Sequence, residues 1–176
     1  VSASALERRG QLGKKAKRGG GEIAHFINLS PQFLANPEGV GELLAKAQQQ
    51  AENGIPVVIE ITERQGGDIL QLKKNLKPLI DAGFHLALDD FGSGYSSFLY
   101  LAELPVNFIK IEGWMVGRIT KDKRIRQLVE TLVNTAQKFG ITTVAECVED
   151  AQTAQVLCDI GVDWAQGYYF SRPEVL

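Results

Sequence analysis

Residues 84–97 read FHLALDDFGSGYSS: an apolar run of strand type reaches two adjacent carboxylates, Asp89 and Asp90, and then a glycine-rich loop. Neighbouring acids repel each other, and a divalent cation between them removes that repulsion. Carboxylate oxygens suit hard cations such as Mg²⁺ and Mn²⁺. An ordinary acidic turn after a strand explains the same residues if this stretch is taken alone. The stretch therefore predicts a strand end that is a candidate metal site.

The same pattern recurs along the chain. Short β-branched runs end in a polar residue and are separated by helical stretches such as 40–51 and 125–139. The expected strands are 24–30, 57–62, 86–91, 108–112, 142–148 and 164–170. Alternating strands and helices indicate an α/β fold with parallel strands.

Several of these strands carry a polar residue between apolar neighbours, as in Ile59-Glu60-Ile61. Alternate side chains of a strand point to opposite faces. We expect the polar residues to project away from the covering helices, which in a barrel means into the interior, near the carboxyl strand ends where active sites lie. A structural ion pair explains one buried acid, but not five convergent polar positions, because burying charge is costly. The five are Asn28, Glu60, Asp89, Lys110 and Glu146.

Six short motifs resemble, in order and spacing, those of the bacterial EAL domain family. They are NLS from Asn28, EITE from Glu60, DDFGSGYSS from Asp89, KIE from Lys110, AECVE from Ala145 and QG from Gln166. The resemblance covers residues 26–173. It implies a modified (β/α)8 barrel of TIM type that binds cyclic di-GMP. In active members it implies hydrolysis to the linear dinucleotide pGpG with Mg²⁺ or Mn²⁺.

The resemblance also implies a role for each matching residue. The implied metal ligands are Asn28, Glu60 and Asp89 for a first cation and Asp90 for a second. The implied catalytic residues, which would position or activate the attacking water, are Lys110 and Glu146. The implied supporting residues are Glu63, which would steady the DDFG loop, and Glu149, which would be a second loop-stabilising group. Gln166 is implied as a polar contact to the ligand.

The Glu-Ala-Leu tripeptide that names the family, whose glutamate is a further metal ligand, is absent from this sequence. Ser4-Ala5-Leu6 matches the last two residues of this motif, and we interpret the match as coincidental. We interpret residues 1–22 as the remnant of a basic helix and linker. Residues 23–176 are expected to form a partial barrel domain. With 176 residues, against about 250 for a typical TIM barrel, about two of the eight strands are expected to be missing. A truncated chain and a naturally degenerate domain both explain this. Such a barrel should not close alone, and its open strand edges would need a partner or an upstream segment.

Two smaller departures fall beside the implied catalytic residues. Glu112 stands where the family usually has aspartate, and its extra methylene is expected to displace a carboxylate. Cys147 stands where the family usually has glycine and adds a side chain where the backbone needs close packing. Both put full activity in doubt.

Three functional classes stay open: a cyclic di-GMP phosphodiesterase, a non-hydrolytic cyclic di-GMP receptor, and a protein-interaction module. The retained carboxylates and Lys110 favour the enzyme for a complete domain. The absent glutamate favours the other two for the chain as written.

Composition indicates a globular domain, with 44% hydrophobic residues, 23% charged residues and a net charge of −2. This balance does not favour binding of a DNA or RNA polymer. Cys147 and Cys158 are expected to be buried thiols, which fits a reducing cytoplasm, although a parent protein with a membrane anchor is compatible with the sequence. The resemblance also implies a homodimer, with Phe98 and Tyr100 at the subunit contact, and an upstream sensor or GGDEF-type domain.

Overall fold

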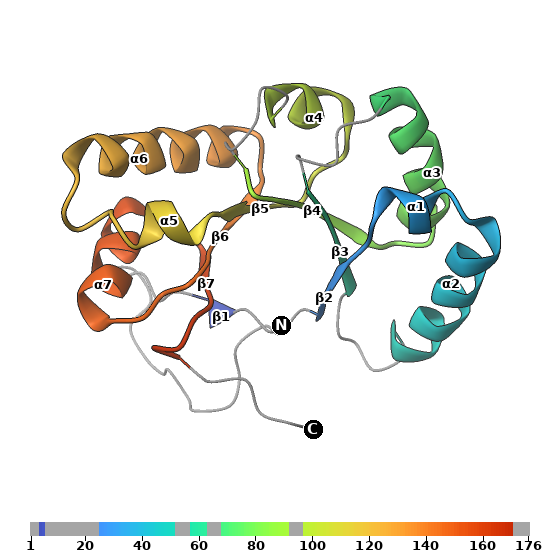
Figure 1. Ribbon diagram of the computed structural model, residues 1–176, viewed down its shortest axis with the longest axis horizontal. Coiled ribbons are helices and arrows are strands. Elements are labelled where there is room, and N and C mark those ends of the chain that lie inside the picture. Colours follow the sequence, from blue (N-terminus) through green and yellow to red (C-terminus); the bar gives the residue numbers. More distant parts are fainter. Residues whose placement is uncertain (1–3, 6–24, 52–56, 63–67, 92–96, 171–176) are drawn as a thin grey trace. The chain divides into compact units, whose positions relative to one another are not determined.

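The computed structural model describes residues 4–5, 25–51, 57–62, 68–91 and 97–170 (Figure 1). The chain forms two compact units. Of the described residues, those within 25–108 form the first unit, and residues 4–5 and 109–170 form the second. Strands and helices alternate in both units, so the expected α/β class is confirmed.

Three parallel strands form the sheet of the first unit: β2 (His25–Asn28), β3 (Val57–Thr62) and β4 (His85–Asp89). The central strand β3 pairs with β2 on one side and β4 on the other. Its residues Val57 to Ile61 are all buried, as expected for a strand covered on both faces. The β-branched sequence VVIEIT suits this position, because branched side chains pack well on a pleated surface.

The helices of the first unit are α1 (Pro31–Leu34), α2 (Pro37–Ala51), α3 (Ile69–Asp81) and α4 (Ser97–Glu103). Asp68 begins α3 as its N-cap, since its side chain accepts a hydrogen bond from the backbone N–H of Leu70. Beyond the end of α3, Gly83 turns the chain into β4 with a φ of 88°. Leu76 and Leu79 are the fully buried residues of this helix.

The second unit contains β5 (Phe108–Ile111), β6 (Thr142–Ala145) and β7 (Trp164–Ala165), with β6 between the other two. Phe108, the first residue of β5, belongs to the first unit. The short strand β1 (Ser4–Ala5) pairs antiparallel with β7, whereas β6 and β7 are parallel. Ser4 and Ala5 are the only residues of 1–22 that the structure describes.

The helices of the second unit are α5 (Gly113–Val116), α6 (Lys123–Lys138) and α7 (Ala151–Ile160). Asp122 and Asp150 cap the first turns of α6 and α7, and Gly161 ends α7 in the left-handed conformation with a φ of 92°. One apolar cluster joins these helices to the strands. Its members are Ile111, Met115, Val116, Ile119, Val129, Val133, Ala145, Val148, Leu157, Val162 and Ala165.

Each of the six expected strands occurs. The strand β3 has the expected bounds, and the other five are shorter than the apolar runs suggested. The largest difference is β7, which ends at Ala165 and is followed at Gly167 by a φ of 154°, a conformation that side-chain-bearing residues rarely adopt. Three side chains differ from expectation in exposure. Cys147 is exposed and Cys158 is half-buried, although both were expected to be buried. Tyr100 is only 5% exposed, so it does not offer a surface for a subunit contact. In the part of the chain that the structure describes, no helix is long and apolar enough to span a bilayer.

Candidate active site

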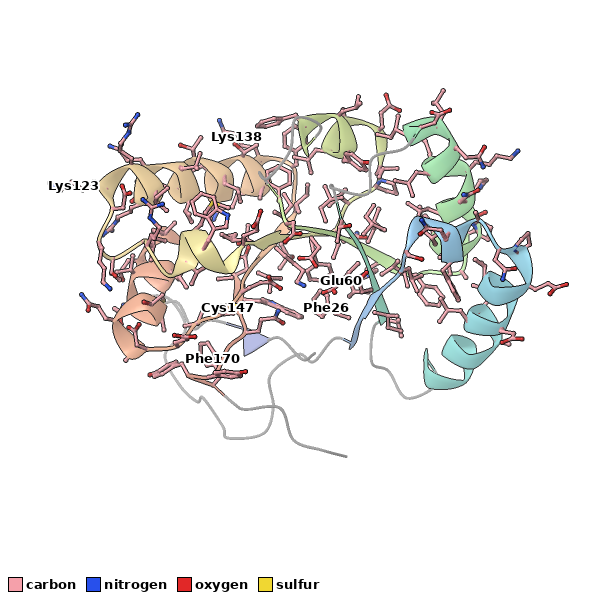
Figure 2. All side chains as sticks on the ribbon, viewed as in Figure 1. Phe26, Glu60, Lys123, Lys138, Cys147 and Phe170 are labelled. Carbon is pink, nitrogen blue, oxygen red and sulfur yellow. The ribbon has the colours of Figure 1, made fainter. Side chains whose placement is uncertain are left out.

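The polar residues of the first unit lie on one face of its sheet. Asn28 is paired in register with Glu60, and two residues further along β3 Thr62 is paired with Asp89. Paired residues of parallel strands point to the same face, and so do residues two apart on one strand. Asn28, Glu60 and Asp89 therefore share a face at the carboxyl ends of β2, β3 and β4. Figure 2 labels Glu60 on β3, where the residue is only 8% exposed.

Asp90 follows β4 in an unusual backbone conformation. Its φ is 56°, in the left-handed region where aspartate is one of the few tolerated non-glycine residues. Its backbone N–H donates a hydrogen bond to Oδ1 of Asp89 at 3.0 Å. The turn thus begins at the two adjacent carboxylates, and the loop residues 92–96 that follow lie outside the described residues.

The donor atoms on this face are carboxylate and amide oxygens, the set that Mg²⁺ and Mn²⁺ prefer. Two acids and one asparagine come from three adjacent strands, which fits the expected ligands in chemical type. Across the described ranges, no group of three or more His, Cys, Asp or Glu side chains is gathered closely enough to hold a metal ion. The ligand roles of Asn28, Glu60, Asp89 and Asp90 therefore stay predictions.

In the second unit, Glu146 receives two polar contacts on the same oxygen. Nζ of Lys110 lies 2.7 Å from Oε1 of Glu146, and Nε2 of Gln166 donates a hydrogen bond to this atom at 2.8 Å. The side chain of Lys110 is 6% exposed and that of Glu146 is 19% exposed. The structure thus brings together three residues that the sequence placed on separate strands, although only the resemblance suggested Gln166.

Backbone hydrogen bonds hold these three residues at the strand ends. The N–H of Glu146 donates to the carbonyl of Ile111, and the N–H of Gln166 donates to the carbonyl of Ala145. The carbonyl of Gln166 in turn accepts from the N–H of Val148. These bonds continue the ladders of β5, β6 and β7 by one step, so that Glu146 and Gln166 keep strand-like positions beyond the strands.

Gly167 makes this arrangement possible. Its φ is 154°, and a Cβ atom at this position would lie 2.2 Å from the carbonyl oxygen and 2.3 Å from the nitrogen of Val148. Every other residue type carries such an atom, so only glycine fits. The sequence motif QG therefore combines a polar side chain aimed at Glu146 with the close backbone approach that aims it.

Cys147 occupies a position that suits glycine for another reason. Its φ is 54°, so the residue adopts the left-handed conformation that glycine adopts without strain. Although the Cys147 side chain is exposed, partial desolvation raises the pKa of its thiol, and the negative charges of Glu146 and Glu149 raise this pKa further, whereas Lys110 lowers it. The thiol is therefore less acidic than an ordinary cysteine. Figure 2 labels Cys147 after β6.

The cysteine side chain occupies space above Gly113, the first residue of α5. A Cβ atom on Gly113 would lie 2.7 Å from Sγ and 2.8 Å from Cβ of Cys147. Contacts this short are essentially never seen between non-bonded carbon and sulfur atoms. The side chain of Cys147 therefore fits here because residue 113 is a glycine and has no side chain. The sequence offered no signal for this pair, because the two positions lie on different segments.

Three predicted residues remain: Glu112 and Glu149, which the structure describes, and Glu63, which it does not. Glu112 is 6% exposed and lies at the N-cap position of α5, without a side-chain capping hydrogen bond. Glu149 is exposed, and its supporting role stays a prediction. Glu63 lies outside the described residues.

Comparison with known proteins agrees with these motifs. The sequence matches the EAL domain family over residues 3–173. The chain belongs to the EAL domain family. It is 40% identical over 159 residues to the cyclic di-GMP phosphodiesterase PdeB of Shewanella oneidensis, a match that covers 85% of this chain and 18% of PdeB.

Solved EAL structures share the fold of this EAL domain. The EAL domain of Mycobacterium smegmatis DcpA is 33% identical with a TM-score of 0.77, covering 87% of this chain and 69% of that one. Klebsiella pneumoniae BlrP1, solved as a manganese and cyclic di-GMP complex, is 34% identical with a TM-score of 0.76, covering 86% of this chain and 39% of BlrP1. The expected fold class, an α/β fold of the TIM-like EAL kind, is confirmed.

The chain spans less than a third of the length of the curated relatives compared here, from 14% of the Bacillus subtilis signaling protein YkoW to 29% of the Escherichia coli protein PdeG. These relatives therefore contain much sequence that has no counterpart here. The similarity concerns the EAL domain.

Proposed function

We propose that this EAL domain binds cyclic di-GMP and hydrolyses one of its two phosphodiester bonds to give linear pGpG. The observation that carries the proposal is the contact of Lys110 and Gln166 with one oxygen of Glu146 at the carboxyl ends of β5, β6 and β7. Family membership and the phosphodiesterase relatives support it.

In the proposed reaction, the oxygen of a water molecule attacks phosphorus, the bond from phosphorus to one ribose oxygen breaks, and the leaving oxygen takes up a proton. The carboxylate of Glu146 accepts the proton that the water loses. Lys110 adds positive charge where negative charge develops on the phosphate oxygens. Gln166, by donating to Oε1, fixes the orientation of the Glu146 carboxylate.

We assign the cation sites to Asn28, Glu60 and Asp89, with Asp90 as the ligand of a second cation. Bound Mg²⁺ or Mn²⁺ would neutralise phosphate charge and lower the pKa of water. The oxygen donors on one face of β2, β3 and β4 support this assignment. Addition of Mn²⁺ should raise the melting temperature of the unmodified protein, and the Asp89→Asn variant should lose most of that rise.

A second candidate function is a receptor that binds cyclic di-GMP without hydrolysis, because Glu112 and Cys147 differ from the residues that the family usually has beside Lys110 and Glu146. The deciding experiment incubates the protein with cyclic di-GMP and Mn²⁺ and separates the products by chromatography. Appearance of pGpG, lost in Glu146→Gln but retained in the surface variant Glu130→Gln, supports the enzyme. Calorimetric binding without any product supports the receptor, and absence of both leaves the interaction module.

Two further assignments follow from the resemblance, and a third, the location, follows from the two cysteines, which cannot define a disulfide framework. We propose that the domain forms a homodimer, that an upstream sensor or GGDEF-type domain controls it, and that it acts in the cytoplasm. Phe98 on α4 is 72% exposed, which supports an apolar subunit contact. Analytical ultracentrifugation should detect a dimer that Phe98→Asp dissociates, while a monomer at all concentrations would refute the first assignment.

A further inference from the structure

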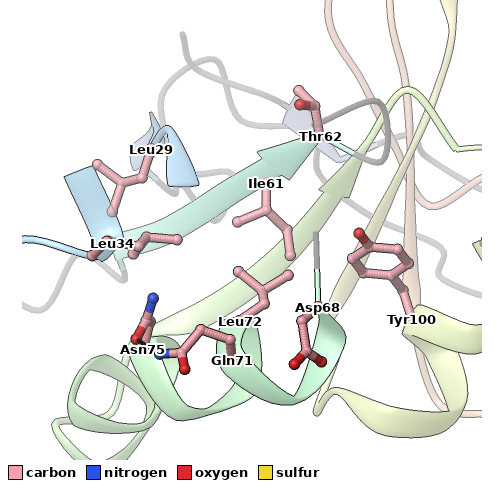
Figure 3. A pocket seen from close by; sticks show the side chains of 10 residues that line it. Leu29, Leu34, Ile61, Thr62, Asp68, Gln71, Leu72, Asn75 and Tyr100 are labelled. Atoms are coloured by element: carbon pink, nitrogen blue, oxygen red, sulfur yellow. Dashed lines mark hydrogen bonds between the residues drawn. The ribbon is translucent and has the colours of Figure 1, made fainter. Parts of the chain in front are cut away.

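A cavity lies on the helix side of the first unit, and we call it the α3 cavity. Its volume is about 200 Å³. Figure 3 shows Ile61 pointing from β3 toward Leu72 on α3, with Tyr100 of α4 beside them. Ile61 is adjacent to Glu60 on the strand, so the two side chains point to opposite faces. Ile61 therefore points to the face opposite the predicted metal ligands, whereas Thr62, which also lines the cavity at the end of β3, shares a face with Glu60.

The inner wall of the α3 cavity is apolar. Leu29, Leu34 and Ile61 are 6%, 3% and 3% exposed, and Tyr100 is 5% exposed. An apolar cavity of about 150 Å³ in a protein stays dry and accepts benzene. A cavity of 200 Å³ with such walls therefore has room for a six-membered ring and a small head group.

The rim of the α3 cavity is polar and carries one charge. Gln71 and Asn75 satisfy each other, because Nε2 of Gln71 donates to Oδ1 of Asn75 at 2.8 Å. Asp68 is the only ionisable residue among the described residues that line the cavity, apart from the phenol of Tyr100. Its Oδ1 accepts from the N–H of Leu70 at 2.9 Å, which holds the carboxylate at the rim.

We propose that the α3 cavity binds a compact aliphatic amine in its ammonium form. The ring or branched chain would occupy the space between Ile61 and Leu72, and the ammonium would face the carboxylate of Asp68. Size excludes a second molecule of cyclic di-GMP, whose two guanines and two phosphates far exceed the volume. The carboxylate of Asp68 repels carboxylates and phosphates, so it disfavours anionic ligands at this rim.

Two probes with the same ring test this proposal. Cyclohexylammonium and cyclohexanecarboxylate are titrated separately into the 176-residue protein, and the methyl NMR signals of Leu29, Ile61 and Leu72 are followed. The ammonium should shift these signals saturably, and the carboxylate should bind at least about ten-fold more weakly. Equal binding of the two probes, or no shift at these methyl groups, would overturn the proposal.

The variants Ala35→Leu and Asp68→Asn test the site without removing a predicted catalytic residue, and Ala102→Leu is the control. Ala35→Leu adds bulk at the rim and should weaken ammonium binding, whereas Ala102→Leu, at an exposed position on α4, should not. Asp68→Asn keeps an N-cap for α3, because asparagine also accepts from the helix backbone, but it removes the charge. This variant should bind both probes with similar affinity. Retention of the ammonium preference in Asp68→Asn would refute the charge assignment.

Discussion

Nζ of Lys110 lies 2.7 Å from Oε1 of Glu146, and the lysine side chain is only 6% exposed. Removal of one partner leaves the other charge in a poorly solvated place. We expect Lys110→Met to lower the free energy of unfolding by about 3 kcal/mol. Urea denaturation measures the loss.

Two comparisons distinguish the loss of the Lys110–Glu146 ion pair from the general effect of replacing a lysine. The double variant Lys110→Met with Glu146→Gln should recover part of the stability, because no uncompensated charge remains. Lys77→Met removes a partner from the exposed pair with Asp81, whose side chains are 70% and 59% exposed. It should change the stability by less than about 1 kcal/mol. Equal losses in Lys110→Met and Lys77→Met would contradict a buried interaction.

Gly113 and Cys147 should be coupled energetically. Gly113→Ala places a Cβ atom where Sγ of Cys147 lies, so we expect a loss of about 1–3 kcal/mol. In a Cys147→Gly background the space is empty, and the same alanine should be neutral or slightly stabilising, because alanine favours helices. Thermal unfolding of the four proteins gives the coupling. Additive effects would mean that the two side chains do not compete for the same space.

Thr143 and Asp163 form a reciprocal lock between β6 and the start of β7. The N–H and the hydroxyl of Thr143 both donate to Oδ2 of Asp163 at 2.9 Å, and the N–H of Asp163 donates to Oγ1 of Thr143 at 3.1 Å. Thr143 is fully buried. Thr143→Val preserves the shape but removes the hydroxyl, and it should cost about 1–3 kcal/mol.

The matched control is Thr131→Val. Thr131 lies exposed on α6 and donates its hydroxyl only to the carbonyl of Gln127. Solvent replaces that bond, so chemical denaturation should detect a change of no more than about 0.5 kcal/mol. A similar cost at both positions would argue against the lock.

Stability should fall in acid partly through Asp150. Hydrogen bonds from the backbone N–H and then the hydroxyl of Thr153 lower the pKa of Asp150 below its ordinary value of 3.8. A carboxyl whose pKa is lower in the folded state contributes stability above pH 3.8 and loses it as the pH falls through the folded pKa. Asp150→Asn should reduce this dependence, since the amide keeps the cap without titrating.

Melting temperatures at about pH 5 and about pH 2.5 provide the measurement. The drop between them should be smaller in Asp150→Asn than in the unmodified protein. Asp159→Asn is the control on the same helix, because the Asp159 side chain accepts from the side chain of Gln155 instead of capping a helix end. An identical acid response in Asp150→Asn and the unmodified protein would contradict the assignment.

The sequence was sufficient for features that depend on local periodicity. The alternation around Glu60 predicted both β3 and the face on which Asn28 and Asp89 join it, because a strand repeats every two residues. The family's glycine at position 147 agrees with the left-handed backbone found at Cys147. Each of these features depends on only a few residues that are neighbours in the sequence.

Features that depend on how particular side chains from different segments fit together could not be predicted. The meeting of Cys147 with Gly113 and the lock of Thr143 with Asp163 join positions at least 20 residues apart. The α3 cavity also needs four elements to be placed around Ile61 before it exists. The apolar run 164–170 suggested a longer strand than β7, because the steric demand of Gly167 against Val148 is invisible in a hydrophobicity pattern.

The contact between Cys147 and Gly113 also bears on the order in which mutations at these two positions are tolerated. With cysteine at position 147, a Cβ atom at position 113 would lie 2.7 Å from the sulfur, so any residue there other than glycine requires the neighbouring atoms to shift. Starting from glycine at both positions, the thiol can be acquired without this cost. A side chain at position 113 is likewise gained at lower cost once the cysteine has been lost.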